Sequence, residues 1–244
     1  LNNKKAPFDN VNVRKALNLS LDRNVITDKV LGQGQTPTYV FTPTYIEEGQ
    51  LIQQPAYSKE PMAQRNEEAI KLLEEAGYSK ANPLKFSILY NTNENHKKVA
   101  IAAASMWKAN TKGLIDVKLE NQEWKTYIDS RRAGRYDAAR AGWNADYNQA
   151  TTFGNYFLSN SSNNTAKYAN PEYDKAIAES YVATDAEGRA KAYAKAEEIL
   201  AKDFGIVPIF NYVNPRLVKP YVKGYSGKDP QDHIYLRNLY IIKH

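Results

Sequence analysis

The stretch Arg140-Ala141-Gly142-Trp143-Asn144-Ala145-Asp146-Tyr147-Asn148 follows a short alternating run of residues that begins at Tyr136. Alternation of this kind is typical of a strand, and a glycine at its end lets a second backbone come close. The tryptophan and tyrosine of the stretch present flat apolar surfaces on either side of one carboxylate, that of Asp146. We interpret the stretch as a recognition edge.

Such an edge can capture an extended ligand by its main chain. Its backbone exchanges hydrogen bonds with the ligand, aromatic side chains cover the ligand's flanks, and Asp146 can pair with an ammonium group. The alternative is a strand-to-loop corner in which Trp143 fills the core and Asp146 caps the following turn, since Asp and Asn are ordinary turn residues. Spacing alone leaves both interpretations open.

Composition limits the class of protein. The chain has 244 residues, of which 42% are hydrophobic, enough for one large domain or two modest ones. It contains no run of about 18 apolar residues, so we expect no membrane-spanning segment. No signal-peptide core follows the first residues, and the chain starts without Met, which indicates a processed or truncated product.

The charge distribution does not favour a nucleic-acid partner, and the residues that could ligate a metal do not favour a metal site. The net charge is +6, but Lys and Arg are scattered among 27 acidic residues, which is typical of a solvated, mildly basic surface. The chain has no Cys, and its histidines, His96, His233 and His244, stand at none of the spacings of a metal site. Nucleotide-binding glycine motifs are also absent, so we expect no cofactor and no nucleic-acid partner.

The centre of the chain predicts an α/β fold. Hydrophobic periodicity indicates a strand at Leu84–Asn91, a helix at about 94–109, a strand near 115–120, a helix at 124–132 and a strand at 136–143. Strands and helices that alternate in this way form an open α/β sheet.

The flanking segments are mainly helical. The segment 32–61 is rich in Pro, Thr and Tyr and predicts a long surface loop. The residues after Asn214 are also loop-rich, so the one candidate for a domain boundary lies near Asn214. Further elements are expected as helices from about Val11, from Asp22 to Gly32 and over 67–76, 151–158, 171–181 and 185–202, and as a strand over 206–213.

An enzyme would need a catalytic pair. Glu123 and Asp146 could act as two carboxylates in one cleft, in the manner of a glycosidase. Most acidic residues are solvated surface groups, and the sequence contains nothing that indicates a raised pKa for either carboxyl. The hydrolase interpretation therefore stays an alternative.

Six separated segments carry a resemblance that spans the chain from end to end. They are NNKKAPFDNVNVRKAL, RNEEAIKLLEEAGY, NQEWKTYIDSRRAGRYDAARAGWNADYN, LSNSSNNTA, YVNPRLVKPYVKGYSGKDP and IYLRNLYIIKH. In this order they resemble the C-terminal half of bacterial periplasmic oligopeptide-binding proteins, the peptide receptors of ABC importers in family 5 of the solute-binding proteins. Because many motifs occur in the same order, the resemblance is specific. It favours the interpretation of residues 140–148 as a recognition edge over that of a strand-to-loop corner.

The resemblance implies one lobe of a two-lobed periplasmic binding protein of type II, cluster C. Residues 1–213 would form the peptide-binding lobe, a mixed sheet flanked by helices, and residues 214–244 would return to the other lobe, which this sequence does not contain. The hinge would fall near Tyr212 to Asn214. Such receptors are periplasmic, are not enzymes, and deliver oligopeptides to the membrane permease of an ABC importer.

The resemblance also implies roles for single residues. Asp146 would pair with the amino terminus of the peptide, while the backbone at Gly142 and Asn144 would add the peptide as an extra strand. The relatives carry Cys at the position of Asn144. This departure is mild, because the backbone of this residue, and not its side chain, would bind the peptide. The remaining implied residues are Arg131, Arg140 and His96 as partners of the peptide carboxylate, Trp124 and Trp143 as aromatic pocket walls, and Tyr212 as a hinge-side wall.

Relatives reuse this scaffold with altered pockets. Receptors for murein peptide, dipeptide, haem or a nickel complex are therefore alternatives within the same class. A carboxylate at Asp146 favours a ligand with a free amino terminus, and so favours peptides.

Overall fold

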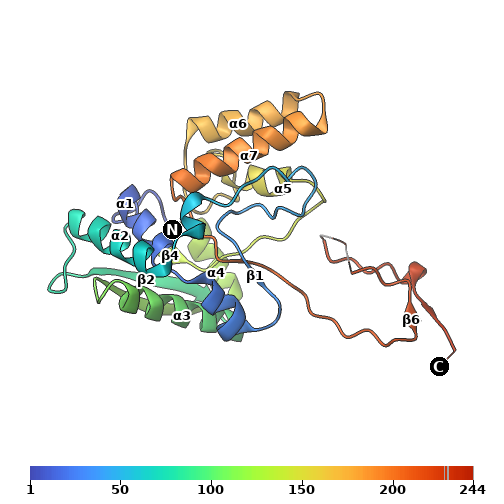
Figure 1. The fold of residues 1–244 in the computed structure, drawn as a ribbon, viewed down its shortest axis with the longest axis horizontal. Coiled ribbons are helices and arrows are strands. Elements are labelled where there is room, and N and C mark those ends of the chain that lie inside the picture. The colour runs from blue at the N-terminus through green and yellow to red at the C-terminus, as the bar shows by residue number, and fades with distance from the viewer. Residues whose placement is uncertain (228, 230, 244) are drawn as a thin grey trace.

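The computed structural model describes residues 1–227, 229 and 231–243, so His244, considered above, lies outside the described residues. The fold is built on a three-stranded parallel sheet with strand order β3-β2-β4. Helices flank the sheet, a helical group lies beside it, and the C-terminal tail extends away from both (Figure 1). The predicted α/β class is confirmed.

The sheet and its crossover helices follow the predicted order. Strand β2 (Leu84–Asn91) pairs along its whole length with β3 (Ile115–Gln122). Helix α3 (Glu94–Asn110) connects these two strands, and α4 (Trp124–Arg132) leads from β3 to β4 (Ala138–Ala139). The predicted bounds of β2 and α4 are confirmed, and β3 runs two residues further than predicted.

The third predicted strand is wrong in length. A strand over 136–143 was expected, but only Ala138 and Ala139 pair with β2. The Arg140 N–H adds one more bond, to the Leu89 carbonyl at 2.8 Å, and the chain then leaves the sheet. The ring of Tyr212 lies against the backbone at Gly142, immediately beyond this point.

The strand predicted over 206–213 is also too long. Strand β5 contains only Phe210–Asn211, which pairs antiparallel with β1 (Thr36–Pro37). Pro208 has no N–H to contribute to a ladder, and its carbonyl accepts a hydrogen bond from the side chain of Arg23 instead. Side-chain contacts therefore replace most of the expected ladder.

The segment 32–61 is only partly a surface loop. Val40, Ile46 and Ile52 are at most 3% exposed, so this part of the prediction is wrong. Besides β1 the segment carries the short 3-10 helix η2 (Ala56–Lys59). It is held by its own apolar side chains, which pack into the body of the lobe.

The remaining helices agree with the prediction except at their ends. The helix predicted from residue 67 begins at residue 62, directly after Pro61, and the helix predicted over 151–158 is divided into two short ones. Gly32, with φ +63°, ends the second helix as predicted. The elements are α1 (Val11–Leu19), the π-helix η1 (Val25–Leu31), α2 (Met62–Glu75), α5 (Thr151–Gly154), the 3-10 helix η3 (Asn155–Phe157), α6 (Pro171–Val182) and α7 (Ala186–Lys202).

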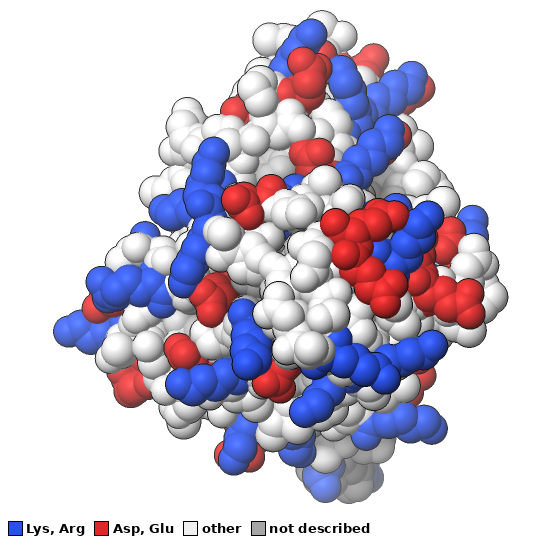
Figure 2. All heavy atoms as spheres, turned by 90° about the vertical axis from the view of Figure 1, so that its left-hand side faces the viewer, with Lys and Arg blue, Asp and Glu red and all other residues white. Residues whose placement is uncertain are grey.

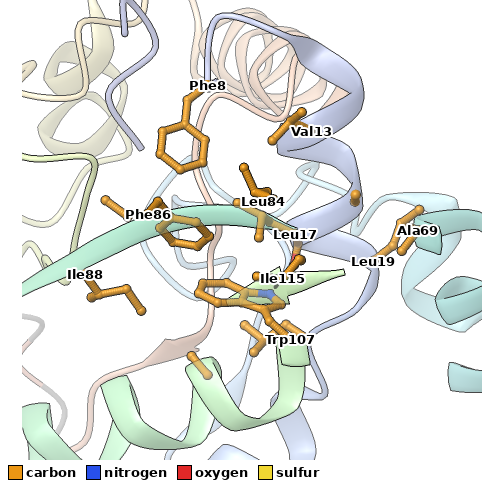
Figure 3. Close-up of a cluster of buried hydrophobic side chains, with 14 of the residues drawn as sticks. Phe8, Val13, Leu17, Leu19, Ala69, Leu84, Phe86, Ile88, Trp107 and Ile115 are labelled. Atoms are coloured by element: carbon orange, nitrogen blue, oxygen red, sulfur yellow. Dashed lines mark hydrogen bonds between the residues drawn. The ribbon is translucent and has the colours of Figure 1, made fainter. Parts of the chain in front are cut away.

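Two large apolar clusters hold the lobe together. The first packs α1, α2 and α3 onto the sheet, with Phe86 of β2 between Phe8 and Trp107 (Figure 3). The second joins α5, η3, α6 and α7 around Tyr173 and Tyr193. Burial of these side chains is the main source of stability of both parts.

The tail after Asn214 forms little regular structure, as predicted. It contains β6 (Val222–Lys223) and β7 (Tyr240–Ile241), which pair antiparallel, and the 3-10 helix η4 (Leu236–Asn238). Leu217, Leu236 and Ile241 are between 68% and 105% exposed. The tail therefore presents apolar side chains to solvent.

The surface charge is mixed where it can be seen. On the face shown in Figure 2, Lys and Arg side chains alternate with Asp and Glu side chains. Eight of the ion pairs that Lys or Arg forms among the described residues, such as Lys191 with Glu187, have side chains at least 20% exposed on both partners. Pairs of this kind contribute little to stability. No described helix is long and apolar enough to cross a membrane.

Arg23 joins three parts of the fold that are separate in sequence. Its side chain is fully buried, and Nε donates to the carbonyls of Thr38 at 3.0 Å and Pro208 at 2.7 Å. Nη1 donates to the Asn18 carbonyl at 3.1 Å, and the guanidinium lies 4.0 Å above the centre of the Tyr39 ring. Burial lowers the pKa of Arg23, because it disfavours the charged form.

We predict that Arg23→Met destabilises the chain by roughly 3 kcal/mol, because buried carbonyls lose their donor. Urea unfolding followed by circular dichroism measures the free energy of unfolding. The exposed Arg132 supplies the control variant, Arg132→Met, which should change it by less than about 0.5 kcal/mol. Equal stability of Arg23→Met and the parent chain would contradict this account.

Candidate functional site

A cavity of about 910 Å³ lies where the two apolar clusters meet. Ile88 and Trp107 of the first cluster line it on one side, and Phe153 and Tyr156 of the second on the other. Residues 138–145 run along it without interruption. The predicted recognition edge therefore forms a wall of this cavity.

The backbone of residues 141–145 is unpaired. Within the described part of the chain none of its N–H or carbonyl groups takes part in a hydrogen bond, although the groups on either side, at Arg140 and Asp146, do. Ala141, Gly142 and Asn144 are exposed. Since main-chain polar groups need partners, this edge can accept another extended chain.

Gly142 is in close contact with Tyr212. A Cβ atom at Gly142 would come within 1.8 Å of the Tyr212 hydroxyl oxygen, so any side chain here would displace the ring. The guanidinium of Arg140 lies 5.4 Å from the centre of the same ring. No described hydrogen bond uses the Arg140 side chain, so its donors are available to a ligand in the cavity.

Asp146 is exposed and does not itself line the cavity, but it directly follows Ala145, the last residue of the run that does. Its N–H donates to the Thr152 hydroxyl at 3.0 Å, and that hydroxyl lies 3.4 Å from Oδ2 of the same carboxylate. The Asp146 carbonyl accepts a hydrogen bond from the side chain of Gln231 in the tail. Thr152 thus fixes the position of Asp146 and leaves most of its carboxylate accessible.

Arg131 is buried in the wall of the cavity. Its Nη2 donates to the hydroxyls of Tyr156 at 3.0 Å and Thr165 at 2.9 Å. Burial lowers the pKa of Arg131, but the neighbouring phenols of Tyr127 and Tyr156 outweigh it and the net shift is upward. Arg131 is therefore a fixed positive charge behind the aromatic wall.

Trp143 and Asn144 also line the cavity. The Trp143 ring is half-buried and packs edge-on against Tyr156, with 5.0 Å between the ring centres. Its indole Nε1 is buried without a hydrogen-bond partner among the described residues. A buried donor of this kind is satisfied if a ligand supplies an acceptor.

His96 and Trp124 lie outside the wall of the cavity. His96 Nδ1 is 2.7 Å from Oδ1 of Asn91, at the end of β2, and the ring is close enough to Arg140 for their charges to interact. The Trp124 ring is 57% exposed and lies 5.8 Å from Tyr127, whose hydroxyl donates to the Arg140 carbonyl. Both side chains are thus linked to Arg140.

The nine predicted residues divide into three groups. Asp146 directly follows the run that lines the cavity, and His96 and Trp124 lie beyond Arg140. The residues that line the cavity are Arg131, Arg140, Gly142, Trp143, Asn144 and Tyr212.

Sequence reasoning missed two further walls. One is formed by Phe41, Tyr45 and Ile46 of the segment 32–61, and the other by Asp229 and Gln231 of the tail. The aromatic residues of the segment were a signal that it packs against something. Nothing in the local pattern of the tail indicates that it reaches Asp146.

The paired carboxylates of a hydrolase are not brought together. Glu123 is the N-cap of α4, where its carboxylate accepts from the Lys125 N–H at 2.9 Å, and it does not line the cavity. Among the described residues, no group of three or more His, Cys, Asp or Glu side chains is arranged to hold a metal ion.

The His96 ring should stay neutral at pH values well below 6.5, the ordinary pKa of histidine. Burial, and then the positive charge of Arg140, lower its pKa from 6.5 to about 4. As the pH falls, His96 therefore takes up a proton in the unfolded chain before it does so in the folded chain. The free energy of unfolding should decrease as the pH drops from 6.5 to about 4. NMR titration of the ring should give a midpoint of about 4. Arg140→Gln should raise the midpoint, Arg132→Gln should not, and a midpoint near 6.5 in the parent chain would contradict this account.

Curated relatives and solved structures are similar over the whole chain, among them the following three. The periplasmic oligopeptide-binding protein OppA of Haemophilus influenzae is 97% identical over 244 residues, which are 100% of this chain and 45% of the relative. OppA of Salmonella typhimurium is 55% identical and covers 100% of this chain and 44% of the relative. The crystal structure of Haemophilus influenzae OppA in complex with RPPGFSPFR has a TM-score of 0.93, at 97% identity, over 100% of this chain and 47% of that one.

The chain thus spans a little under half the length of the curated relatives that it matches. The family model for the middle region of the bacterial extracellular solute-binding proteins, family 5, matches residues 1–165. From the fold, the cavity and this match, the chain belongs to the bacterial extracellular solute-binding proteins of family 5.

Proposed function

We propose that this chain is the C-terminal part of a periplasmic receptor that binds oligopeptides in extended form and delivers them to the permease of an ABC importer. The observation that carries the proposal is the unpaired backbone of residues 141–145, which lines the cavity and ends at Asp146. Main-chain hydrogen bonds do not depend on the side chains of the peptide, so such a receptor can accept peptides of many sequences.

Asp146 sets the direction of the peptide. Its accessible carboxylate would accept hydrogen bonds from the free amino terminus, and the first residues of the peptide would then pair with the backbone at Gly142 and Asn144. The unpartnered Nε1 of Trp143 would find an acceptor in the peptide, while the Trp143 ring would border a side-chain pocket.

The basic residues would bind the carboxyl terminus. Arg140 is the main candidate, because its guanidinium is free of described hydrogen bonds and lies in the cavity wall above Tyr212. His96 lies beyond Arg140 and could serve longer peptides. Arg131, already bonded to three hydroxyls, would act through its charge.

The chain would supply one lobe and part of another. Residues 1–213 would be the peptide-binding lobe, and residues 214–244 would return to the missing N-terminal lobe. The exposed apolar side chains of the tail, Leu217, Leu236 and Ile241, support this division, because solvated tails rarely carry so many. Trp124 and Tyr212 would face the second lobe across the cleft.

The receptor would return its ligand unchanged. Glu123 and Asp146, the two carboxylates expected of a hydrolase, are not brought together, because Glu123 caps α4 away from the cavity, and the relatives named above are binding proteins. A receptor for murein peptide, dipeptide, haem or a nickel complex is the alternative, but Asp146 at the end of an open backbone edge favours a peptide with a free amino terminus.

We predict that Asp146→Asn weakens peptide binding by the full-length receptor by roughly 2–5 kcal/mol, because the buried ammonium loses its charged partner. Titration calorimetry with a mixed-sequence tripeptide measures this loss. Asp129 is exposed on α4 and does not line the cavity, so Asp129→Asn is the control and should bind as the parent does. Unchanged affinity of Asp146→Asn would exclude this role.

A further inference from the structure

One wall of the cavity comes from the loop 38–48, a part of the chain with no assigned role. Phe41, Pro43, Tyr45 and Ile46 all line the cavity. Phe41 is fixed by its packing against aromatic rings of the second cluster, with 4.8 Å between its ring centre and that of Phe157, and Ile46 is 1% exposed. Tyr45, in contrast, is 66% exposed. It is the side chain of this wall that a ligand can reach.

The loop is joined to the stretch that carries Asp146. The Ala150 N–H donates to the Glu47 carbonyl at 3.0 Å, and the Glu47 N–H donates to Oδ1 of Asn148 at 3.3 Å. Tyr45 lies two residues before Glu47, and Asp146 two residues before Asn148. Tyr45 and Asp146 therefore each lie within two residues of the junction between the loop and this stretch.

Glu197 of α7 holds the same loop from behind. Its carboxylate is 5% exposed, with Oε1 accepting from the Thr42 N–H at 2.7 Å and from the Thr42 hydroxyl, and Oε2 accepting from the Phe41 N–H at 3.0 Å. No basic side chain is among its hydrogen-bond partners. Burying a carboxylate without a cation is costly, so its three bonds to two consecutive loop residues make it a specific anchor.

We propose that Tyr45 contacts the first side chains of the bound peptide, and that Glu197 is a positioning residue which acts through Tyr45. This inference rests on the proposed function and names a preference within it. Peptides with an aromatic or large apolar residue next to their amino terminus gain a ring contact at Tyr45. Peptides with small residues there do not.

Titration calorimetry of the full-length receptor with Phe-Ala-Ala, Ala-Phe-Ala and Ala-Ala-Ala tests the contact. Tyr45→Ala should weaken binding of at least one phenylalanine peptide by about tenfold and that of Ala-Ala-Ala by less than about twofold. Tyr45→Phe keeps the ring and should bind all three as the parent does. An equal loss for all three peptides, or no loss, would overturn the assignment of Tyr45.

A double-mutant cycle tests the anchor. In Glu197→Gln the amide NH₂ group must face the Phe41 or Thr42 N–H, so a bond is lost, while Glu198→Gln on the exposed face of α7 is the matched control. Glu197→Gln should weaken the same phenylalanine peptide by about fivefold and speed amide exchange at residues 41 and 42. Combined with Tyr45→Ala it should cost no more than Tyr45→Ala alone, because both act on one contact.

The outcomes separate the inference from the function on which it rests. If the parent receptor binds none of the peptides, the proposed function fails and the inference with it. If it binds all three and the losses from Glu197→Gln and Tyr45→Ala add, or Glu197→Gln weakens Ala-Ala-Ala equally, only the inference is overturned. The exposed position of Tyr45 keeps its variants folded, so their result stands even if Glu197→Gln is unstable.

Discussion

The candidate site depends on the point at which β4 leaves the sheet. After Ala138 and Ala139 the chain makes one more bond to β2, through the Arg140 N–H, and the next five residues have no main-chain partners among the described residues. The ring of Tyr212 lies against Gly142 within this segment, so a side chain at this position would displace the ring. A longer β4 would have used up the groups that a peptide needs. The shortness of this strand is thus what makes an accessible edge in the middle of a folded lobe.

The two apolar clusters give the edge its surroundings. The first cluster fixes β2 and so fixes Arg140, while the second places aromatic rings opposite, and the cavity is the space left between them. Buried polar anchors hold the connecting segments in register. Arg23 binds the carbonyls of Thr38 and Pro208, and Glu197 binds Phe41 and Thr42 a few residues later, so the first part of this cavity wall is held at two points. Loss of such an anchor leaves a buried group unpaired, which makes these positions sensitive to substitution.

Much of the fold could be predicted from local pattern, and the errors have a common cause. Strand β2 and helix α4 have the predicted bounds because period-2 and period-3.6 patterns and clear caps define them. The ends of β4 and β5 could not be predicted, since local pattern carries no signal of the contacts made near them by Tyr212 and Arg23, which are distant in sequence. For the site, the carboxylate and aromatic residues of 140–148 were visible in the sequence, whereas the specific roles came from resemblance. The wall at Tyr45 was missed because a Pro- and Thr-rich segment carries no periodicity that reports burial.

The central claim is that a free amino terminus is bound at Asp146, at the end of an open backbone edge. Calorimetric titration of the full-length receptor, and of this chain, with one tripeptide and its N-acetylated form tests it most directly, because acetylation removes only the charge and donors at the amino terminus. The account predicts tight binding of the free peptide by the full-length receptor and loss of binding on acetylation. Equal binding of both forms, or of neither, would contradict it and point to a different class of ligand on the same scaffold.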